Sequence, residues 1–137
     1  MHFTVLGVPK VLQRHRFTKK GFTYDPSVMD KKQFAMQAAI RKPGKPIKVP
    51  LGLTMTFYFN RPKSHYRTGK NSNLLKTGMD SRWMKGKKDL DNLIKLVCDS
   101  LEGIFFTNDS LVCSIQAEKL YCLENEQPRT VVGIEIL

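Results

Sequence analysis

The residues best suited to chemistry are carboxylates gathered in the second half of the chain. Asp89 and Asp91 are two residues apart, Lys95 follows Asp91 by four residues, and Asp109 lies in a later polar segment. Carboxylates that approach one another repel unless a cation lies between them. Hard oxygen ligands, with room left for water and a phosphate oxygen, are what Mg²⁺ prefers. If these side chains meet, they predict a site for metal-assisted phosphodiester hydrolysis.

An amphipathic helix should position the first two carboxylates. At about 100° per residue, the polar residues after Asp91 and the apolar residues occupy opposite faces of the segment KKDLDNLIKLVCDSLEGI. Either Asp89 or Asp91 could be an ordinary helix N-cap. One cap needs one aspartate, and if Asp89 is still extended, both side chains can converge on one ion. The apolar face that we expect to be buried consists of Leu93, Ile94, Val97 and Leu101.

Asp109 lies in the segment Thr107-Asn108-Asp109-Ser110, which is typical of a turn between two apolar runs. An aspartate in a turn is ordinarily a turn-former. Here, however, a strand running from Leu111 to Tyr121 could bring Asp109 beside the start of the helix. We therefore expect Asp109 to join Asp89 and Asp91.

The charge is divided unevenly along the chain. Of 137 residues, 41% are hydrophobic and the net charge is +11. Residues 1–88 hold 20 Lys and Arg against three acids, a net +17, whereas residues 89–137 have a net charge of −6. One region thus suits phosphates and the other a cation, which favours an enzyme acting on nucleic acid. A non-catalytic binding module has no need for the acidic region.

Two basic segments are candidates for DNA contact. The segment RHRFTKKG, ending at Gly21, predicts a hairpin or arm, and Asn60 to Lys88 reads as a long functional loop. Tyr66 and Trp83 in this loop could stack on bases, although anchoring the loop to the core is the commoner role of such aromatics. The candidate DNA-binding residues are Arg14, Arg16, Lys19, Lys20, Arg61, Lys63, Arg67, Lys70, Lys76, Arg82, Lys85, Lys87 and Lys88.

The remaining pattern predicts a single α+β domain over residues 1–137, with a mixed sheet and two principal helices. We expect strands at 2–8, 53–59 and 111–121 and at the C-terminus, VVGIEIL. The first helix should begin at Asp25-Pro26 and end by Pro43-Gly44, with Met29 and Met36 as core filler.

Other functional classes find no support in the sequence. No apolar run approaches the roughly 20 residues that a transmembrane helix needs, and the N-terminus lacks the pattern of a secretory signal. The three cysteines have no zinc spacing and should be buried free thiols. The three histidines lack metal-site spacing, and no organic cofactor is expected. We expect a cytoplasmic protein.

The stretch DLDNLIK, followed by Asp99-Ser100-Leu101 and Asn108-Asp109, resembles the signature of the RusA family of Holliday-junction resolvases. The basic arm and Tyr24-Asp25-Pro26 match as well, and order and length fit across nearly the whole chain. The resemblance implies a bacterial or phage homodimer that binds four-way junctions and nicks two opposing strands symmetrically with Mg²⁺. By position, it makes Asp89, Asp91 and Asp109 the metal-binding catalytic carboxylates and Lys95 the essential lysine.

Several roles remain open at the level of sequence. Lys95 could offset charge on the attacked phosphate or orient water, or it could simply pair with Asp91 or Asp99. Asn92 and Asp99 are expected to support the metal ligands from behind. Mn²⁺ is a conceivable substitute for Mg²⁺, and flaps, forks or RNA are alternative substrates. The candidate surface for the contact between two copies includes Phe105 and Phe106.

Overall fold

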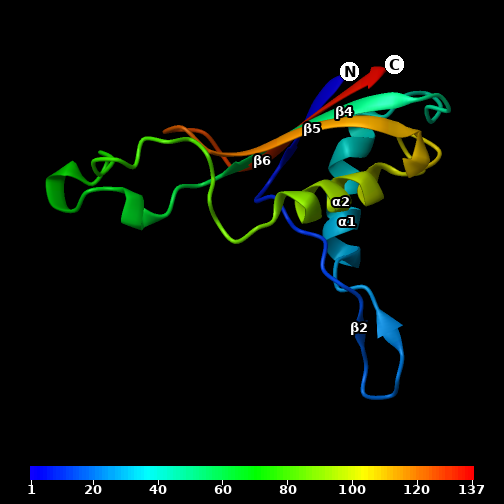
Figure 1. The fold of residues 1–137 in the computed structure, drawn as a ribbon, viewed down its shortest axis with the longest axis horizontal. Helices are drawn as coiled ribbons and strands as arrows, with labels where there is room; N and C mark the ends of the chain where they lie inside the picture. Colours follow the sequence, from blue (N-terminus) through cyan, green and yellow to red (C-terminus); the bar gives the residue numbers. More distant parts are fainter.

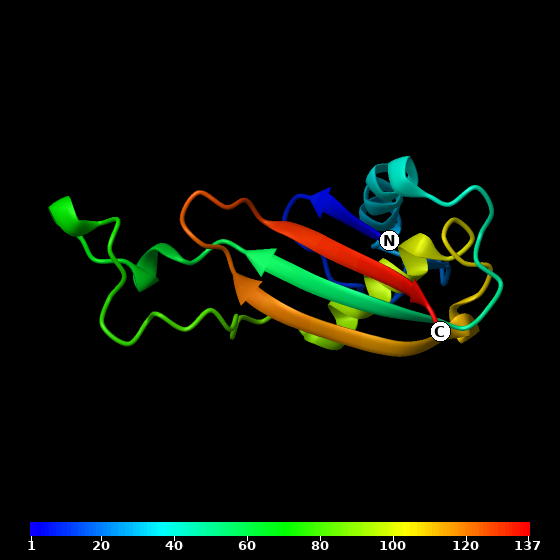
Figure 2. The same cartoon turned by 90° about the horizontal axis from the view of Figure 1, so that it is seen from above.

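A four-stranded mixed sheet forms the centre of the protein. In the computed structural model, which describes residues 1–137, the strands are β1 (His2–Leu6), β4 (Leu51–Phe59), β5 (Val112–Tyr121) and β6 (Arg129–Ile136). Their spatial order is β1-β6-β4-β5, with β4 and β5 parallel and the other pairs antiparallel. Figure 2 shows this sheet from its uncovered face, with the helices beneath it. The predicted α+β class with a mixed sheet and two principal helices is confirmed.

Alternation along β4 explains which face of the sheet is buried. Leu53, Met55 and Phe57 point to the core, whereas Thr54 between them is exposed. The partner of Met55 on β6 is Val132, which is also buried. Because both strands present apolar residues to the same side, the helices must cover that side to remove it from water.

Helix α1 (Val28–Ala38) and helix α2 (Leu90–Leu101) cover the inner face of the sheet, as Figure 1 shows. α1 begins later than predicted, because Ser27 is the N-cap and the Asp25 carboxylate instead accepts a hydrogen bond from the Ser27 amide. A short 3₁₀ turn extends α1 to Arg41.

The prediction that the methionines of α1 fill the core is wrong. Phe34 and Ala38 are buried, whereas Met29 and Met36 are exposed. The two sets lie on different faces of the helix, and only the Phe34 face meets α2 and the sheet. α1 therefore presents an apolar face to solvent, consisting of Met29, Met36 and Ile40.

Phe105 and Phe106 are completely buried, so the expectation that they mark a contact surface between copies is also wrong. The chain after α2 folds back against the segment that precedes β4, with Ile47 donating its amide to the Phe105 carbonyl at 2.8 Å. The Phe105 ring stacks on Phe3 of β1 with centroids 4.9 Å apart. These two aromatics close one end of the core.

Two basic extensions leave the body of the protein in different directions (Figure 1). The first is a hairpin of β2 (Arg16–Phe17) and β3 (Thr23–Tyr24), which confirms the predicted arm. The second is the long loop over residues 60–88, which contains only short 3₁₀ turns at Lys63–His65 and Gly69–Asn71 and isolated bridges. Helix α2 starts between the two extensions.

The cysteines form no disulfide, and their burial differs. Cys122 is buried and Cys98 is half-buried, whereas Cys113 is exposed, so the expectation that all three are buried is wrong for Cys113. None of the helices combines the length and the apolar character that crossing a membrane requires.

Candidate functional site

Asp89 and Asp91 present their carboxylates at the start of α2. Asp89 is the N-cap residue and has an extended backbone, with φ −70° and ψ 132°, as the convergence of both side chains on one ion requires. Its carboxylate makes no capping hydrogen bond, although the position usually uses one. Asp91 lies in the first helical turn, and its side chain is 70% exposed. Both carboxylates are thus available to a ligand.

Two lysines fix the approach of the chain to this helix end. Lys88 donates from Nζ to the Pro9 carbonyl at 2.9 Å, and its ammonium lies 5.5 Å from the centre of the Phe59 ring. Lys119 on β5 donates to the Lys88 carbonyl at 2.8 Å. Burial lowers the pKa of Lys88, and the nearby charge of Lys10 adds to this effect. The segment before Asp89 is therefore held by internal contacts from two sides.

The hairpin is tied to the same helix end. The Leu12 amide, close to the root of the hairpin, donates to the Asn92 carbonyl at 3.0 Å. The next residue, Gln13, donates its amide to the Ser27 hydroxyl at 2.8 Å. These bonds fix the base of the basic hairpin beside the turn that carries Asp91.

Lys95 lies one turn after Asp91 on the same face of α2. Its Nζ is 3.9 Å from an Asp91 carboxylate oxygen, and the two side chains are 60% and 70% exposed. An exposed pair at this separation stabilises a helix by only about 0.3–0.5 kcal/mol. Lys95 is therefore not locked by Asp91 and is free to meet a phosphate.

Asp109 lies towards the other end of α2. Its amide donates to the Glu102 carboxylate at 3.1 Å. Burial raises the pKa of the half-buried Cys98 thiol to about 11, and the nearby charges of Asp99, Asp109 and Glu102 raise it further. Cys98 is seven residues beyond Asp91, which is about 10 Å of helical rise. Within one chain, Asp109 thus lies near the C-terminal part of α2 and not beside Asp91 at its start.

The separation has a topological reason. β5 begins at the C-terminal end of α2 and runs back along it, so that Lys119, near the end of the strand, reaches the start of the helix. The 3₁₀ turn Asp109–Leu111, which precedes β5, stays at the opposite end. The expected position of Asp109 beside the helix start is therefore not found in the single chain.

The remaining predicted supporting residues are also placed by α2. Asp99 is half-exposed and lies 3.9 Å from Lys31 of α1, which itself pairs with Asp25. Asn92 contributes its carbonyl to the hydrogen bond with Leu12. Both residues thus connect α2 to neighbouring segments.

The donor set fits a divalent ion only in part. No group of three His, Cys, Asp or Glu side chains is arranged to hold a metal ion. Mg²⁺ is commonly held by one or two carboxylates, with waters and substrate phosphate completing its shell. Asp89 and Asp91 meet that requirement because both are exposed and neither is engaged in a capping bond.

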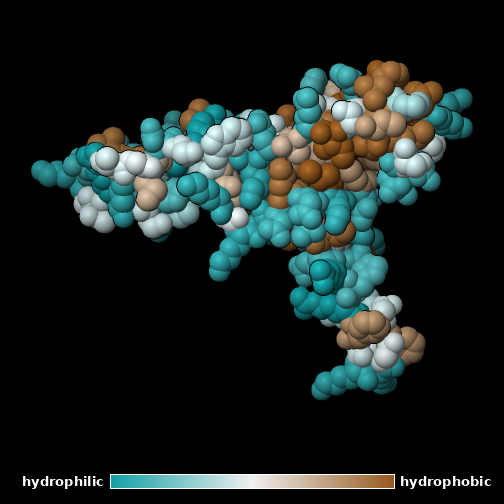
Figure 3. Space-filling view, viewed as in Figure 1, coloured by the Kyte–Doolittle hydropathy of each residue, from teal (hydrophilic) through white to brown (hydrophobic).

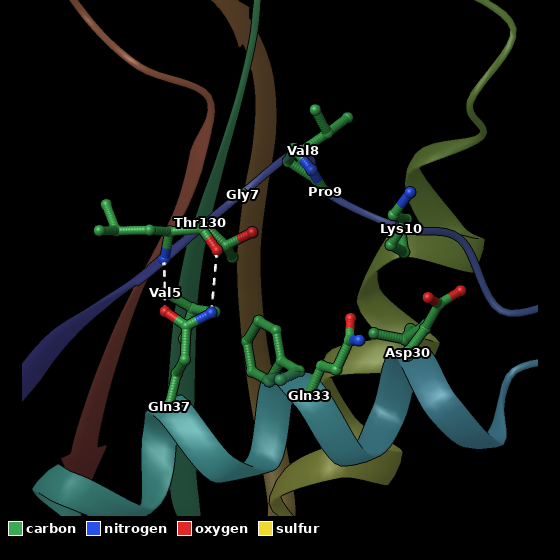
Figure 4. A pocket seen from close by; sticks show the side chains of 12 residues that line it. Val5, Gly7, Val8, Pro9, Lys10, Asp30, Gln33, Gln37 and Thr130 are labelled. Carbon is green, nitrogen blue, oxygen red and sulfur yellow. Dashed lines mark hydrogen bonds between the residues drawn. The ribbon is translucent and has the colours of Figure 1, made fainter.

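A small cavity of about 120 Å³ lies between β1 and α1 (Figure 4). Gln37 closes one side by bonding both the amide and the carbonyl of Leu6, at 3.0 and 3.1 Å. Lys10 and Asp30 line it, but none of Asp89, Asp91, Lys95 and Asp109 does. The candidate site is an open helix face and is separate from this cavity.

The candidate DNA-binding cations differ in how freely they can meet a phosphate. Arg61 donates to the Met79 and Ser81 carbonyls, both at 2.8 Å, and lies over the Tyr121 ring. Arg82 bonds the Tyr121 carbonyl and Glu126, and Arg67 bonds Leu75. Arg67 is nevertheless exposed. The exposed candidates that donate to no backbone carbonyl are Arg14, Arg16, Lys19, Lys20, Lys63, Lys70, Lys76, Lys85 and Lys87.

The two aromatics of the long loop also differ. Tyr66 is half-buried, and its backbone bridges to Leu75 within the same loop. Trp83 bridges to Leu120 of β5 through its backbone, while the residue as a whole is 59% exposed. Trp83 therefore remains available for stacking.

Comparison with known proteins shows the family to which the chain belongs. Residues 7–135 match the family model described as endodeoxyribonuclease RusA, so the match includes all four candidate catalytic residues. The chain belongs to the RusA family. Membership in it implies endodeoxyribonuclease activity on Holliday junctions.

A relative of this RusA-family chain is the uncharacterized protein YqaN of Bacillus subtilis (strain 168). The two are 30% identical over 137 residues, which cover 96% of this chain and 93% of YqaN. The similarity extends over nearly the full length of both.

Sequence reasoning missed Lys119, which positions the RusA active-site candidates from β5. The available signal was its register, since Lys119 shares a strand face with Ala117, which packs on the core. A lysine on the inner face of a strand usually reaches a specific partner.

Proposed function

We propose that this protein is a Mg²⁺-dependent, structure-selective endodeoxyribonuclease that resolves Holliday junctions by paired, symmetric nicks in DNA recombination and repair. The observation that carries the proposal is a pair of exposed carboxylates at the start of α2, Asp89 and Asp91, that make no capping hydrogen bond. A basic hairpin is hydrogen-bonded to the same helix start. Membership in the RusA family supports the same chemistry.

In this proposal, Asp89 and Asp91 hold the divalent ion, for which Mn²⁺ can substitute. The bound ion would supply an activated water and charge stabilisation at the phosphate. Lys95, one turn further along the exposed face, offsets negative charge on the attacked phosphate. Asn92 and Asp99 steady the helix that carries these groups, through Leu12 and Lys31.

Asp109 is retained as a catalytic carboxylate on the strength of the family resemblance. The geometry of one chain supports only the pair at the helix start. The proposed catalytic role of Asp109 therefore rests on the resemblance alone.

The exposed cations of the hairpin and of the long loop are assigned to the DNA backbone. The hairpin and the long loop lie on either side of the start of α2 (Figure 1), so a strand held by both would pass that helix start. Cations of this kind bind phosphates without reading sequence. The branched geometry of the DNA, rather than its bases, would then determine the choice of substrate.

The active form is proposed to be a homodimer, because a two-fold dimer matches the two-fold symmetry of opposing junction arms. The exposed apolar face of α1, with Met29, Met36 and Ile40, is assigned to the contact between copies. Met36→Glu should shift the protein towards monomer in sedimentation velocity. An unchanged sedimentation coefficient would exclude this face.

The test is incubation of a synthetic immobile four-way junction with the purified protein, with and without Mg²⁺, followed by mapping of each strand. The proposal predicts Mg²⁺-dependent nicks at symmetric positions in two opposing strands. Binding without any nick would identify a non-catalytic nucleic-acid-binding module. Faster cleavage of flaps, forks or RNA at matched salt would reassign the substrate.

A further inference from the structure

The tip of the hairpin exposes aromatic side chains that no part of the protein covers. Phe17 is 75% exposed and Phe22 is 68% exposed, and Tyr24 at the base of β3 is also exposed. Figure 3 shows apolar spheres on the lower part of the projecting arm, next to the hydrophilic residues at its end and away from the body of the protein. An aromatic ring that stays in water does not gain the large free energy of burial, so exposed rings indicate a surface that binds a partner.

The charge around these rings favours a polyanion as that partner. Residues 10–24 contain five Lys and Arg and no acidic residue. The first acid after them, Asp25, is paired with Lys31 at the root of α1, which holds the pKa of that carboxyl below its ordinary value. An acid-free arm with protruding rings suits a nucleic acid, which offers both phosphates and stacking faces.

The tip is ordered by its own hydrogen bonds. The Thr18 amide bonds the Phe22 carbonyl at 2.6 Å, and the Thr18 hydroxyl accepts from the Phe22 amide at 3.1 Å. Gly21, with φ +83°, closes the turn through a 3.0 Å bond to Thr18. The rings are therefore presented by a defined turn, which lowers the conformational entropy that the hairpin loses when it binds a partner.

The root of the hairpin fixes the distance between the rings and the carboxylates. Leu12 is bonded to Asn92, beside Asp91, and Phe17 follows five residues later. Five extended residues span at most about 16 Å. At about 3.4 Å per nucleotide of one strand, this is roughly five nucleotides.

We propose that Phe17 and Phe22 form a wedge that stacks on bases unpaired at the branch point of DNA, while the flanking cations hold the adjacent phosphates. A branch point is where base steps are already interrupted, so unstacking them there costs least. The wedge thereby makes the hairpin a reader of branching and places the cut within roughly five nucleotides of the branch point. This inference rests on the proposed action on branched DNA.

The experiment measures binding without cleavage. Wild-type protein in EDTA is titrated into a four-way junction that carries 2-aminopurine at the branch point, and into a linear duplex of equal length. Unstacking raises 2-aminopurine fluorescence, so the signal reports wedge insertion directly. Phe17→Ala/Phe22→Ala removes both rings, and Phe17→Trp/Phe22→Trp retains stacking. The control Ile136→Ala removes an exposed apolar side chain, 65% exposed, from the distant end of β6.

The double alanine variant should abolish the fluorescence rise and weaken junction binding by roughly 10-fold or more, with linear-duplex affinity unchanged. The tryptophan variant should restore both signals, and Ile136→Ala should match wild type. Arg14→Ala/Arg16→Ala should instead weaken binding to both DNAs and lower the salt slope by about 2.

A full fluorescence rise with the double alanine variant would overturn the wedge while leaving the proposed function intact. Equal loss of junction and duplex binding would also overturn it, as would a change in sedimentation coefficient that shows the rings covering a protein surface. If wild-type protein itself gave no fluorescence rise and bound both DNAs equally, the proposed action on branched DNA would fail first.

Discussion

The two ends of helix α2 carry similar residues in different surroundings. At the start, Asp89 and Asp91 are exposed, make no capping hydrogen bond and are flanked by the two basic extensions. At the other end, Asp109 and Glu102 lie together, joined by an amide-to-carboxylate hydrogen bond. The comparison indicates that, within one chain, the carboxylates at the start of α2 are the ones that lie between the two basic extensions.

Neutralising Asp109 should give the largest effect. We expect Asp109→Asn to reduce Mg²⁺-dependent nicking of a four-way junction to background, because the resemblance to the RusA family makes Asp109 a catalytic carboxylate and a neutral amide cannot replace its charge. Single-turnover cleavage measures the effect. Glu118→Gln, an exposed carboxylate on the uncovered face of the sheet, is the matched control and should cleave at the wild-type rate.

Retained cleavage by Asp109→Asn would contradict this expectation. It would confine the metal site to Asp89 and Asp91 at the start of α2, in agreement with the absence of a three-carboxylate group in the single chain. The two ends of the helix would then be functionally independent.

Lys95 lies between the two ends and should give the next largest effect. Lys95→Ala should slow single-turnover cleavage by about 10²–10³-fold, the magnitude typical of losing one group that stabilises transition-state charge. Lys95→Arg should recover part of the rate because it keeps the charge. Since the pair with Asp91 is exposed and weak, thermal unfolding should hardly change. A large fall in Tm with normal cleavage would make Lys95 structural.

Asp99 should matter less than Lys95. It faces Lys31 at 3.9 Å and supports the packing of α2 on α1, so Asp99→Asn should reduce cleavage by at most about 10-fold. Junction affinity in EDTA should be unchanged. A loss equal to that of Asp91→Asn would move Asp99 into direct contact with the ion.

The reactivity of the Cys98 thiol reports the electrostatic surroundings of the C-terminal end of α2. Its modification is expected to affect function least. Its pKa is raised to about 11, so the thiol stays protonated at lower pH and its thiolate forms only as the pH nears that value. A thiol reagent at pH 8 should therefore modify the exposed Cys113 first. Mass spectrometry after brief labelling checks the order, and rapid modification of Cys98 at pH 8 would contradict it.

Much of the fold follows from local patterns in the sequence. Strict alternation predicted β4, and the angular separation of polar and apolar residues predicted α2, whose Leu93 and Val97 are buried and whose Lys95 is exposed. In both elements one face is strongly apolar, so the burial of that face dominates. The arm around Phe17 was also predictable, because Gly21 can adopt the positive φ of its turn.

Other features depend on contacts that the sequence does not display. Helical spacing alone could not tell that the Met36 face of α1 is exposed while Phe34 is buried, because both faces carry apolar residues. The position of Asp109 depends on the direction of β5 relative to α2, which is a property of topology. Arg61 likewise donates to the Met79 and Ser81 carbonyls of the long loop, and the sequence alone could not show that the fold brings these groups together.

The most direct test of the account compares Asp91→Asn with wild-type protein on the same labelled four-way junction. The account predicts that Asp91→Asn binds the junction in EDTA with nearly unchanged affinity, yet makes no nick in either strand after Mg²⁺ is added. Wild-type protein should make both nicks. Nicking by Asp91→Asn at the wild-type rate would contradict the assignment of the start of α2 as the catalytic site.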